Sequence, residues 1–386
     1  MSDIVIAGIG QMPVGEHYHL SLRNLAFDAL ERAIQDAAGP SVDMVCVANM
    51  LASTLTHQAN LGALIADFSG LTGIEATTIE AGGASGGAAL RMAYLAVASG
   101  EVNVALVVGI EKITDKLGPG VEAAQMLSTD SDFEAVQGLT PVAQSALLMQ
   151  RYLHEYRPPR AAFGGFSRVA HANAVSNPFA MFRSPLSAET YNQAAPVSDP
   201  LNMFDVAPVA DGAAAIILTR RELLPPGYAH PIVRISGSSQ VTGRLALHDH
   251  PDLLSFDSAR ISVERACRQA GIRPGDVDLF ELYDSSSIIA ALSLEAAGFA
   301  ERGRGWQLAQ HDQLGLHGLL PIATFGGLKA RGNPIGATGV YQAVEATLQL
   351  RGYAGPNQVP NARRALIQSL SGPAASAVTH VLERLA

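Results

Sequence analysis

The chain has 386 residues, more than one ordinary hydrophobic core holds, so two units of similar size or one duplicated fold is expected. Hydrophobic residues make up 48% of the chain and charged residues 16%, which is typical of a well-buried globular protein and excludes a disordered one. The formal net charge of -9 argues against nucleic acid as the main partner, because binding phosphates needs a basic surface.

Cysteine usage and the N-terminus indicate the compartment. The two cysteines, Cys46 and Cys267, imply no disulfide framework and fit a reducing cytoplasm. The N-terminal stretch MSDIVIAGIG lacks a basic region followed by a long apolar run, so no signal peptide is expected. Apolar runs such as residues 104–108 are far too short to span a bilayer. These features predict a cytoplasmic α/β protein without a membrane partner.

The first part of the chain alternates predicted strands and helices. Short apolar runs ending in glycine indicate strands, and apolar residues at a spacing of three to four indicate helices. Strands are expected at residues 4–7, 44–48, 77–80 and 101–110, and helices at 21–37, at about 60–68 and after a glycine-rich turn at 82–87.

The later part of the chain repeats this order. Strands are expected at residues 232–235, 277–283, 365–370 and 377–382, and helices at 259–270, 288–294 and 340–350, the last after residues 321–324 and a second glycine-rich turn at 326–339. The repetition predicts an internally duplicated α/β fold, in which each half is a mixed sheet covered by helices.

The duplication also predicts domain boundaries. We assign residues 1–228 to the N-terminal half and 229–386 to the C-terminal half. Residues of about 115–200 form an insertion outside the repeat, where substrate binding usually resides, and residues 203–218 return to complete the first half. The N-terminal AGIGQMPVG lacks GxGxxG spacing, so no nucleotide cofactor is expected there, and no spaced Cys/His/Asp cluster indicates a metal site.

Two glycine-rich segments carry a resemblance to a known family. Residues 332–339, GNPIGATG, preceded by GGLKA at 326–330, look like the thiolase active-site block, in which thiolases have Gly-His-Pro. Residues 80–90, EAGGASGGAAL, are similar to the thiolase nucleophile turn, Cys-x-Ser-Gly, and Gly83 occupies the position of the cysteine.

Further segments in the right order extend the resemblance over essentially the whole chain. Residues 108–112 (VGIEK) resemble the strand end that follows in the family. Residues 171–173, 177–178 and 208–215 match the sterol-carrier-protein-type branch with its archaeal-like relatives. The chain is therefore identified as a member of the thiolase superfamily.

This resemblance implies a fold, a substrate class and partners. The fold would be the five-layered αβαβα thiolase fold with mixed sheets, and the insertion would lie over the active site. The substrate would be an acyl-CoA thioester, with coenzyme A as part of the substrate and no separate cofactor. Family members are at least dimers, and relatives in this branch often work with a small OB-fold, zinc-ribbon protein.

The departures from the family pattern concern the residues that carry the chemistry. Besides Gly83, Asn333 replaces the histidine of Gly-His-Pro. Residues 281–284 read Glu-Leu-Tyr-Asp where the branch usually has Glu-x-His-Asp, so Tyr283 replaces a second imidazole. Residues 368–372 read QSLSG where many thiolases have a second cysteine. By this resemblance the nucleophile, both imidazoles and the proton-shuttling thiol are all replaced.

The remaining residues suggest candidate catalytic groups. Asn333 can donate a hydrogen bond to an enolate but cannot accept a proton as histidine would. Tyr283 and Asp284 stand where the family's imidazole would enter the site, and Tyr283 could relay a proton. Each residue also has a purely structural explanation: Asn333 could be a turn residue, and Tyr283 could be an aromatic side chain that fills a cavity.

Other residues are candidates for substrate binding. His171 is expected to contact the pantetheine region by analogy with the family, and is otherwise a surface histidine. Ser85 is either a substitute nucleophile or, more simply, a helix-capping serine. The remaining candidates, all in or beside the second glycine-rich turn, are Phe325, Gly327, Gly332 and Gly336.

Three functions remain open from the sequence. The leading one is a thiolase-like acyl-CoA-binding protein that is either a binding subunit or a carbon–carbon lyase, which would cleave β-hydroxyacyl-CoA by a retro-aldol reaction that needs no covalent nucleophile. The second is a non-catalytic acyl-CoA or lipid-binding scaffold that works with an OB-fold zinc-ribbon partner. The third is an acetyl-CoA acetyltransferase that uses Ser85. The first two differ in whether the cavity at Gly83 stays open.

Overall fold

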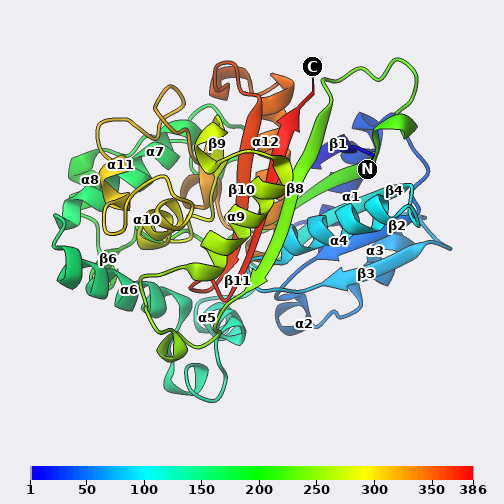
Figure 1. Cartoon of the computed structure of the whole chain (residues 1–386). Coiled ribbons are helices and arrows are strands. Elements are labelled where there is room, and N and C mark those ends of the chain that lie inside the picture. The colour runs from blue at the N-terminus through cyan, green and yellow to red at the C-terminus, as the bar shows by residue number, and fades with distance from the viewer. Residues whose placement is uncertain (1, 386) are drawn as a thin grey trace.

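Strands from the whole chain form one mixed sheet in the computed structural model, which describes residues 2–385 (Figure 1). The strands of this sheet are β1 (Ile4–Gln11), β2 (Met44–Ala48), β3 (Glu75–Ile79), β4 (Val104–Glu111), β7 (Gly212–Arg220), β8 (Val233–Thr242), β9 (Leu279–Glu281), β10 (Arg364–Ser371) and β11 (Ser376–Arg384). Their order is β3-β2-β4-β7-β1-β8-β11-β10-β9. A separate ribbon pairs β5 (Pro196–Ser198) with β6 (Leu201–Asn202).

The pairing of strands repeats between the two halves of the sheet. In the first half β1 is antiparallel to β7, β7 is antiparallel to β4, and β2 is parallel to both β4 and β3. In the second half β8 is antiparallel to β11, β11 is antiparallel to β10, and β10 is parallel to β9. A parallel bridge between Phe280 and Ile322 stands where a fifth strand would pair. The halves join where Val5 lies opposite Arg234, so the predicted duplication is confirmed.

Helices cover both faces of each half. They are α1 (Leu22–Asp36), α2 (Ala52–Leu55), α3 (Leu61–Phe68), α4 (Ser85–Ser99), α5 (Pro119–Gln125), α6 (Pro141–Tyr156), α7 (Gly164–Ala174), α8 (Ala188–Asn192), α9 (Asp257–Ala270), α10 (Ser287–Ala296), α11 (Gly305–Leu308) and α12 (Thr338–Arg351). Both α4 and α12 pack on strands of the two halves, whereas α1 packs on β1, β4 and β7, and α9 packs on β8 and β11. The predicted helix–sheet–helix–sheet–helix layering is therefore confirmed.

Successive side chains of β4 pack alternately into two different hydrophobic cores. Ala105 and Val107 belong to the central core with α4 and α12, and Leu106 and Val108 belong to the outer core with α1. Successive side chains of a strand point to opposite faces, so a strand covered on both faces is apolar throughout. This is why residues 104–108 form an uninterrupted apolar run.

The N-terminal ends of the two central helices meet at glycines. A Cβ atom on Gly86 would lie 2.8 Å from the backbone nitrogen of Gly339, and a Cβ atom on Gly339 would lie 2.3 Å from the backbone nitrogen of Gly87. Only glycine permits this approach. Both predicted glycine-rich turns therefore bring a helix start to the same place, and the candidate site lies there.

Two observed strands differ in length from the predicted ones. The first strand was predicted to end before Gly8, but β1 continues to Gln11. Gly8 and Gly10 instead allow α1 to pack closely, because Cβ atoms there would each lie 2.2 Å from carbonyl oxygens of Ala33 and Ala29. The strand predicted at 277–283 is shorter, since only Leu279–Glu281 pairs with β10.

The predicted insertion is largely helical. Residues 115–200 hold α5, α6, α7 and α8, and α6, α7 and α8 lie with α10 and α11 on one side of the molecule (Figure 1). Tyr152 of α6 donates a hydrogen bond of 2.5 Å to Glu295 of α10, and its ring lies in the same apolar cluster as Phe163 and Leu292. These contacts fix the insertion against the second half of the fold.

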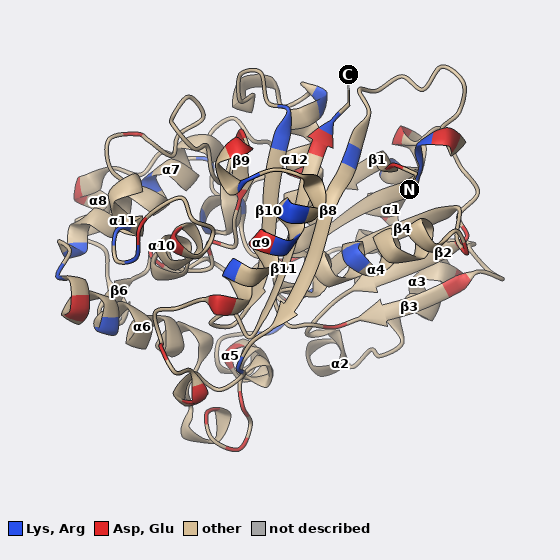
Figure 2. Cartoon of the chain, viewed as in Figure 1, with Lys and Arg blue, Asp and Glu red and all other residues tan. Residues whose placement is uncertain are grey.

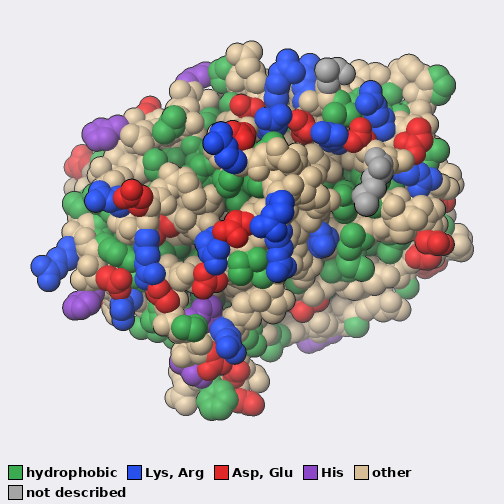
Figure 3. Space-filling model, in the orientation of Figure 1, with side chains coloured by type: hydrophobic (Ala, Val, Ile, Leu, Met, Phe, Trp, Pro, Cys, Tyr) green, Lys and Arg blue, Asp and Glu red, His purple; other side chains and the backbone are tan. Residues whose placement is uncertain are grey.

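Charged side chains lie mainly on helices, loops and strand ends, as Figure 2 shows. On the face seen in Figure 3, basic and acidic side chains are interspersed, so their fields partly cancel. Within residues 2–385 the helices include none with the length and apolar character that crossing a bilayer requires.

Candidate active site

The turn that precedes α4 is closed by Ser85. The Ser85 hydroxyl accepts a hydrogen bond of 2.9 Å from the backbone N–H of Ala81 and donates one of 2.6 Å to the carbonyl of Gly82. The Ser85 side chain is fully buried, and both of its hydrogen-bonding roles are used within the turn. The hydroxyl therefore stabilises the turn around Gly83.

The Tyr283 hydroxyl lies directly against Gly83. A Cβ atom on Gly83 would lie 2.3 Å from the Tyr283 hydroxyl oxygen and 2.6 Å from the carbonyl oxygen of Leu370. No side chain fits into that space, so glycine is required here for steric reasons. The phenol thus occupies the room that the family resemblance assigns to the cysteine side chain.

Burial controls the protonation state of Tyr283. Burial raises the pKa of Tyr283, and the charges of Glu111 and Asp284 raise it further. The Arg331 guanidinium and a side-chain hydrogen bond with Asn333 oppose this rise in pKa. The net effect is a pKa above the ordinary tyrosine value, so the phenol is neutral at physiological pH and can donate a hydrogen bond.

Asn333 is held by the backbone on one side and by a hydroxyl on the other. Its backbone N–H donates to the carbonyl of Pro208 at 2.9 Å, and its carbonyl accepts from the N–H of Ala210 at 3.2 Å. Its Oδ1 accepts a hydrogen bond of 3.0 Å from the Thr338 hydroxyl, at the start of α12. This contact leaves the amide Nδ2 as the donor available to Tyr283 and to a ligand.

Glu111 organises the backbone behind the site, a role that the sequence analysis did not identify. Its carboxylate accepts hydrogen bonds from the backbone N–H groups of Met50, Leu51 and Gly336 at 3.0–3.1 Å and from Asn49 Nδ2 at 2.7 Å. Burial raises the pKa of Glu111 to about 7, although these hydrogen bonds oppose the rise. A Cβ atom on Gly336 would lie 2.8 Å from Glu111 Oε2, so this glycine lets its own N–H reach the carboxylate.

Asp284 lies behind the wall of the site. Its Oδ1 accepts a hydrogen bond of 2.8 Å from the backbone N–H of Leu328, in a short π-helical turn at Gly327–Arg331. A Cβ atom on Gly327 would lie 2.7 Å from both Asp284 oxygens. Burial raises the pKa of Asp284, and the nearby Lys329 opposes the rise. Asp284 therefore braces the turn that leads to Asn333.

Three other predicted binding residues, His171, Phe325 and Gly332, contact other segments of the chain. His171 in α7 makes a hydrogen bond of 3.1 Å between Nδ1 and the carbonyl of Ser184, and burial lowers its pKa. The carbonyl of Phe325 accepts a hydrogen bond of 2.8 Å from Asn177 Nδ2. Gly332 has a φ of +106°, and a Cβ atom there would lie 2.7 Å from Val14.

A cavity of about 440 Å³ opens in front of Tyr283. Three of the predicted residues, Gly83, Tyr283 and Asn333, line it together. The other predicted site residues do not line it: Ser85, His171, Asp284, Phe325, Gly327, Gly332 and Gly336.

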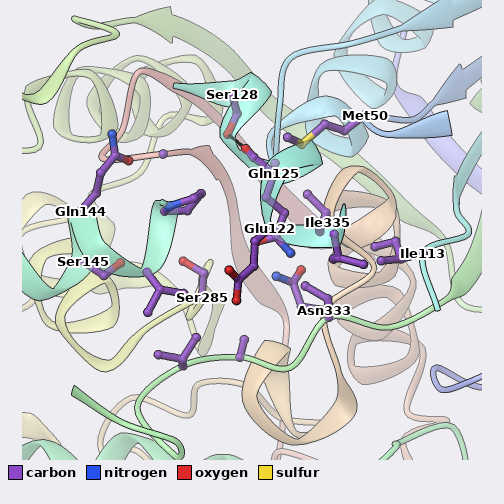
Figure 4. A pocket seen from close by; sticks show the side chains of 18 of the residues that line it. Met50, Ile113, Glu122, Gln125, Ser128, Gln144, Ser145, Ser285, Asn333 and Ile335 are labelled. Carbon is purple, nitrogen blue, oxygen red and sulfur yellow. Dashed lines mark hydrogen bonds between the residues drawn. The ribbon is translucent and has the colours of Figure 1, made fainter. Parts of the chain in front are cut away.

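The cavity wall includes polar residues that the sequence analysis did not single out. Ser285 follows Tyr283 and Asp284 in the chain, and Glu122, Gln125 and Gln144 come from α5 and α6 (Figure 4). Ser285 lies outside the predicted insertion, whereas for the residues of α5 and α6 the available signal is this insertion, which is expected to carry substrate-binding residues. No pattern within it marked these individual side chains.

Both cysteines lie away from this cavity. Cys46 is buried in β2 and Cys267 is buried in α9, and neither lines the cavity wall. Burial raises the pKa of Cys46 to about 12 and that of Cys267 to about 11. Neither thiol is therefore an activated nucleophile.

Comparison with protein families identifies the class of this fold. Residues 4–222 match the thiolase N-terminal domain, and residues 239–384 match the thiolase C-terminal domain-like family. The chain therefore belongs to the thiolase family, as the sequence motifs predicted.

Individual relatives agree with this assignment. The chain is 37% identical to an acetyl-CoA acetyltransferase of Methanothermobacter thermautotrophicus, covering 100% of both chains. It is 28% identical to sterol carrier protein 2 of Rattus norvegicus, covering 97% of this chain and 71% of that protein. Among solved structures, the "Ltp2-ChsH2(DUF35) aldolase" has a similar fold, with a TM-score of 0.84 at 24% identity, covering 99% of this chain and 98% of that one.

Proposed function

We propose that this thiolase-family chain binds an acyl-CoA thioester and cleaves a carbon–carbon bond of a β-hydroxyacyl-CoA by a retro-aldol reaction. Coenzyme A would enter as part of the substrate. The observation that carries the proposal is the position of the Tyr283 hydroxyl, which fills the space in front of Gly83 while the cavity beside it stays open.

The lack of a suitable nucleophile argues against acyl transfer. Thiolysis requires a thiolate that accepts the acyl group, and neither Cys46 nor Cys267 lines the cavity. A serine mechanism would need a free hydroxyl, but the Ser85 hydroxyl is engaged with Ala81 and Gly82. The names of the acetyltransferase relatives support a thioester ligand more strongly than they support the same chemistry here.

Retro-aldol cleavage needs groups that stabilise the negative charge of an enolate, and the site contains such groups. The β-hydroxyl loses its proton and the Cα–Cβ bond breaks. The electron pair of the Cα–Cβ bond forms the thioester enolate, and the β-carbon departs as part of an aldehyde or ketone. The enolate then takes up a proton at Cα. The Asn333 amide can donate to the enolate oxygen, and the adjoining N-terminal ends of α4 and α12 favour negative charge there.

Tyr283 would act on the substrate's β-oxygen. Because its raised pKa keeps the phenol protonated, it suits hydrogen-bond donation to that oxygen better than it suits the role of a free base. Donation to the oxygen stabilises the alkoxide that forms when the proton leaves. This role uses the same phenolic group that closes the space at Gly83.

The rival function is a scaffold that binds acyl-CoA without turnover. A purely structural subunit is expected to fill the cavity with side chains, whereas here about 440 Å³ stays open. The open volume favours a subunit that at least binds a ligand.

We further propose two partners. A second copy of the chain would pair along β3, an edge strand whose Glu75, Thr77 and Thr78 are exposed. A small OB-fold zinc-ribbon protein would be the other partner, by analogy with the solved aldolase whose name joins two components. Co-expression followed by size-exclusion chromatography tests both.

The lyase proposal is tested with a panel of β-hydroxyacyl-CoA substrates of several sizes, including compounds with steroid side chains. The released aldehyde or ketone is measured directly, with the chain alone and with its small partner. Cleavage of one member of the panel supports the proposal. If no member is cleaved under either condition while acetyl-CoA binds, the scaffold function replaces it.

A further inference from the structure

The cavity wall contains few groups that can take a proton from a substrate. Among the described residues its ionisable side chains are Glu16, Tyr18, Lys116, Glu122 and Tyr283. An ammonium group has no acceptor, and both tyrosines have raised pKa values. The two glutamates are therefore the groups in the wall that are suited to act as a base.

The neighbouring aspartate does not fill this role. Asp284 lies outside the cavity wall, and its carboxylate accepts a hydrogen bond from the backbone N–H of Leu328. The proposed reaction thus has an alkoxide stabiliser in Tyr283 and an enolate donor in Asn333, but neither of them is the final proton acceptor.

One face of α5 supplies a carboxylate at the right place. Val121, Glu122 and Gln125 of α5 all line the cavity, and their spacing places them on a single helical face, while Gly118 lines the cavity just before the helix. Val121 is buried with Leu51 and Ile335 in a small apolar cluster, which fixes the orientation of this face. The cavity-lining position of Glu122 is therefore set by packing.

Figure 4 shows the direction of the Glu122 side chain. It extends from α5 into the cavity, toward the wall that carries Ser285 and Asn333, and no hydrogen bond joins it to the other residues drawn. Its carboxylate oxygens are thus free to accept a proton from a ligand. Glu16, in contrast, belongs to a different segment of the cavity wall before α1, and its side chain hydrogen-bonds to Tyr18.

We infer that Glu122 is the general base that removes the β-hydroxyl proton in the proposed retro-aldol reaction. The inference rests on the proposed function. The O–H proton passes to the Glu122 carboxylate, and the electron pair of that bond forms the C=O of the departing fragment. The Cα–Cβ electron pair becomes the enolate, which solvent protonates at Cα. Glu122 then releases its proton to solvent at the cavity mouth, so that protons and electrons balance.

The test compares Glu122 with a glutamate outside the cavity wall. With a β-hydroxyacyl-CoA that the wild type cleaves, Glu122→Gln is expected to lower kcat by about 10² to 10⁴ while acetyl-CoA affinity and melting temperature stay near wild type. Glu264→Gln, at an exposed glutamate of α9 outside the cavity wall, is the control and should retain wild-type kcat. In Glu122→Ala, added formate should restore part of the lost rate, because a small carboxylate can enter the vacated space.

The possible outcomes separate the two proposals. If the wild type cleaves the substrate and Glu122→Gln is equally fast, Glu122 is not the base and the lyase function stands. The same conclusion follows if formate gives no rescue in a folded Glu122→Ala variant that still binds acetyl-CoA. If the wild type cleaves no β-hydroxyacyl-CoA, the proposed function fails and the assignment of Glu122 fails with it.

Discussion

The hydroxyl oxygen of Tyr283 lies 2.3 Å from the point where a Cβ atom on Gly83 would stand. The two residues are far apart in the chain, but each accounts for the residue type at the other position. The phenol needs a residue without a side chain opposite it, and the glycine leaves a space that the phenol fills. By the family resemblance, Gly83 stands at the position of the nucleophile and Tyr283 at that of the second imidazole, so the two positions meet in one contact.

This contact predicts strong coupling between the two positions. Gly83→Ala should lower the free energy of unfolding by about 1–3 kcal/mol, because the new methyl group overlaps the Tyr283 hydroxyl and the Leu370 carbonyl. Combining it with Tyr283→Leu should destabilise the protein by less than the sum of the two single changes, because one of the overlaps is relieved. Chemical denaturation of the four proteins measures this. Strictly additive effects would contradict the contact.

Tyr283→Phe separates proton chemistry from packing. Removing the phenolic oxygen should lower the rate of β-hydroxyacyl-CoA cleavage by about 10² to 10⁴ and leave acyl-CoA affinity almost unchanged, since little contact area is lost. Tyr18→Phe is the matched control, because Tyr18 is an exposed tyrosine of the same cavity wall. This change should leave the cleavage rate at the wild-type value. A Tyr283→Phe variant as fast as the wild type would leave Tyr283 with a packing role alone.

Thiolysis should be absent. Incubation with acetoacetyl-CoA and free CoA is expected to yield no acetyl-CoA, and iodoacetamide should not change any activity found, because both thiols are buried with raised pKa values. Mass spectrometry of the products and of the peptide spanning residues 80–90 makes the check. Recovery of that peptide in acetylated form would establish Ser85 as a nucleophile.

Acyl-CoA binding should depend on the open cavity. Calorimetry with acetyl-CoA is expected to show binding by the wild type, and Gln125→Trp should abolish it, because the indole fills the space beside Glu122. Ala123→Trp, on the exposed face of α5, is the control and should bind normally. Absence of heat and of a melting-temperature shift in the wild type would point to a structural subunit.

Glu111 should make stability depend on pH. Burial raises its pKa from the ordinary 4.5 to about 7, so between these values the unfolded chain releases a proton that the folded protein keeps. The stabilisation is complete below pH 4.5 and is lost as the pH rises to about 7, a change on the order of 3 kcal/mol. In Glu111→Gln this contribution should vanish. Denaturation at pH 5 and pH 7.5 tests it, and equal pH slopes in both proteins would refute the assignment.

Local sequence patterns were sufficient for the framework of this protein. The apolar runs, the helical periodicities and the two glycine-rich turns predicted the duplicated α/β order, and the motifs around Gly83 and Asn333 predicted the family. These features are encoded by residues close together in the chain. The same motifs predicted that Gly83, Tyr283 and Asn333 share one site, and the structure brings these three residues together at the cavity.

Only the tertiary structure decided which neighbouring side chains enter the cavity. Tyr283 lines it and Asp284 does not, since adjacent residues of an extended segment point in opposite directions and the packing of β9 selects which one faces inward. Glu122 gave no local signal, because its position depends on the contact of Val121 with Leu51 and Ile335, which are distant in the chain. The family and the framework follow from local pattern, whereas the cavity and its proton acceptors follow from how distant segments pack.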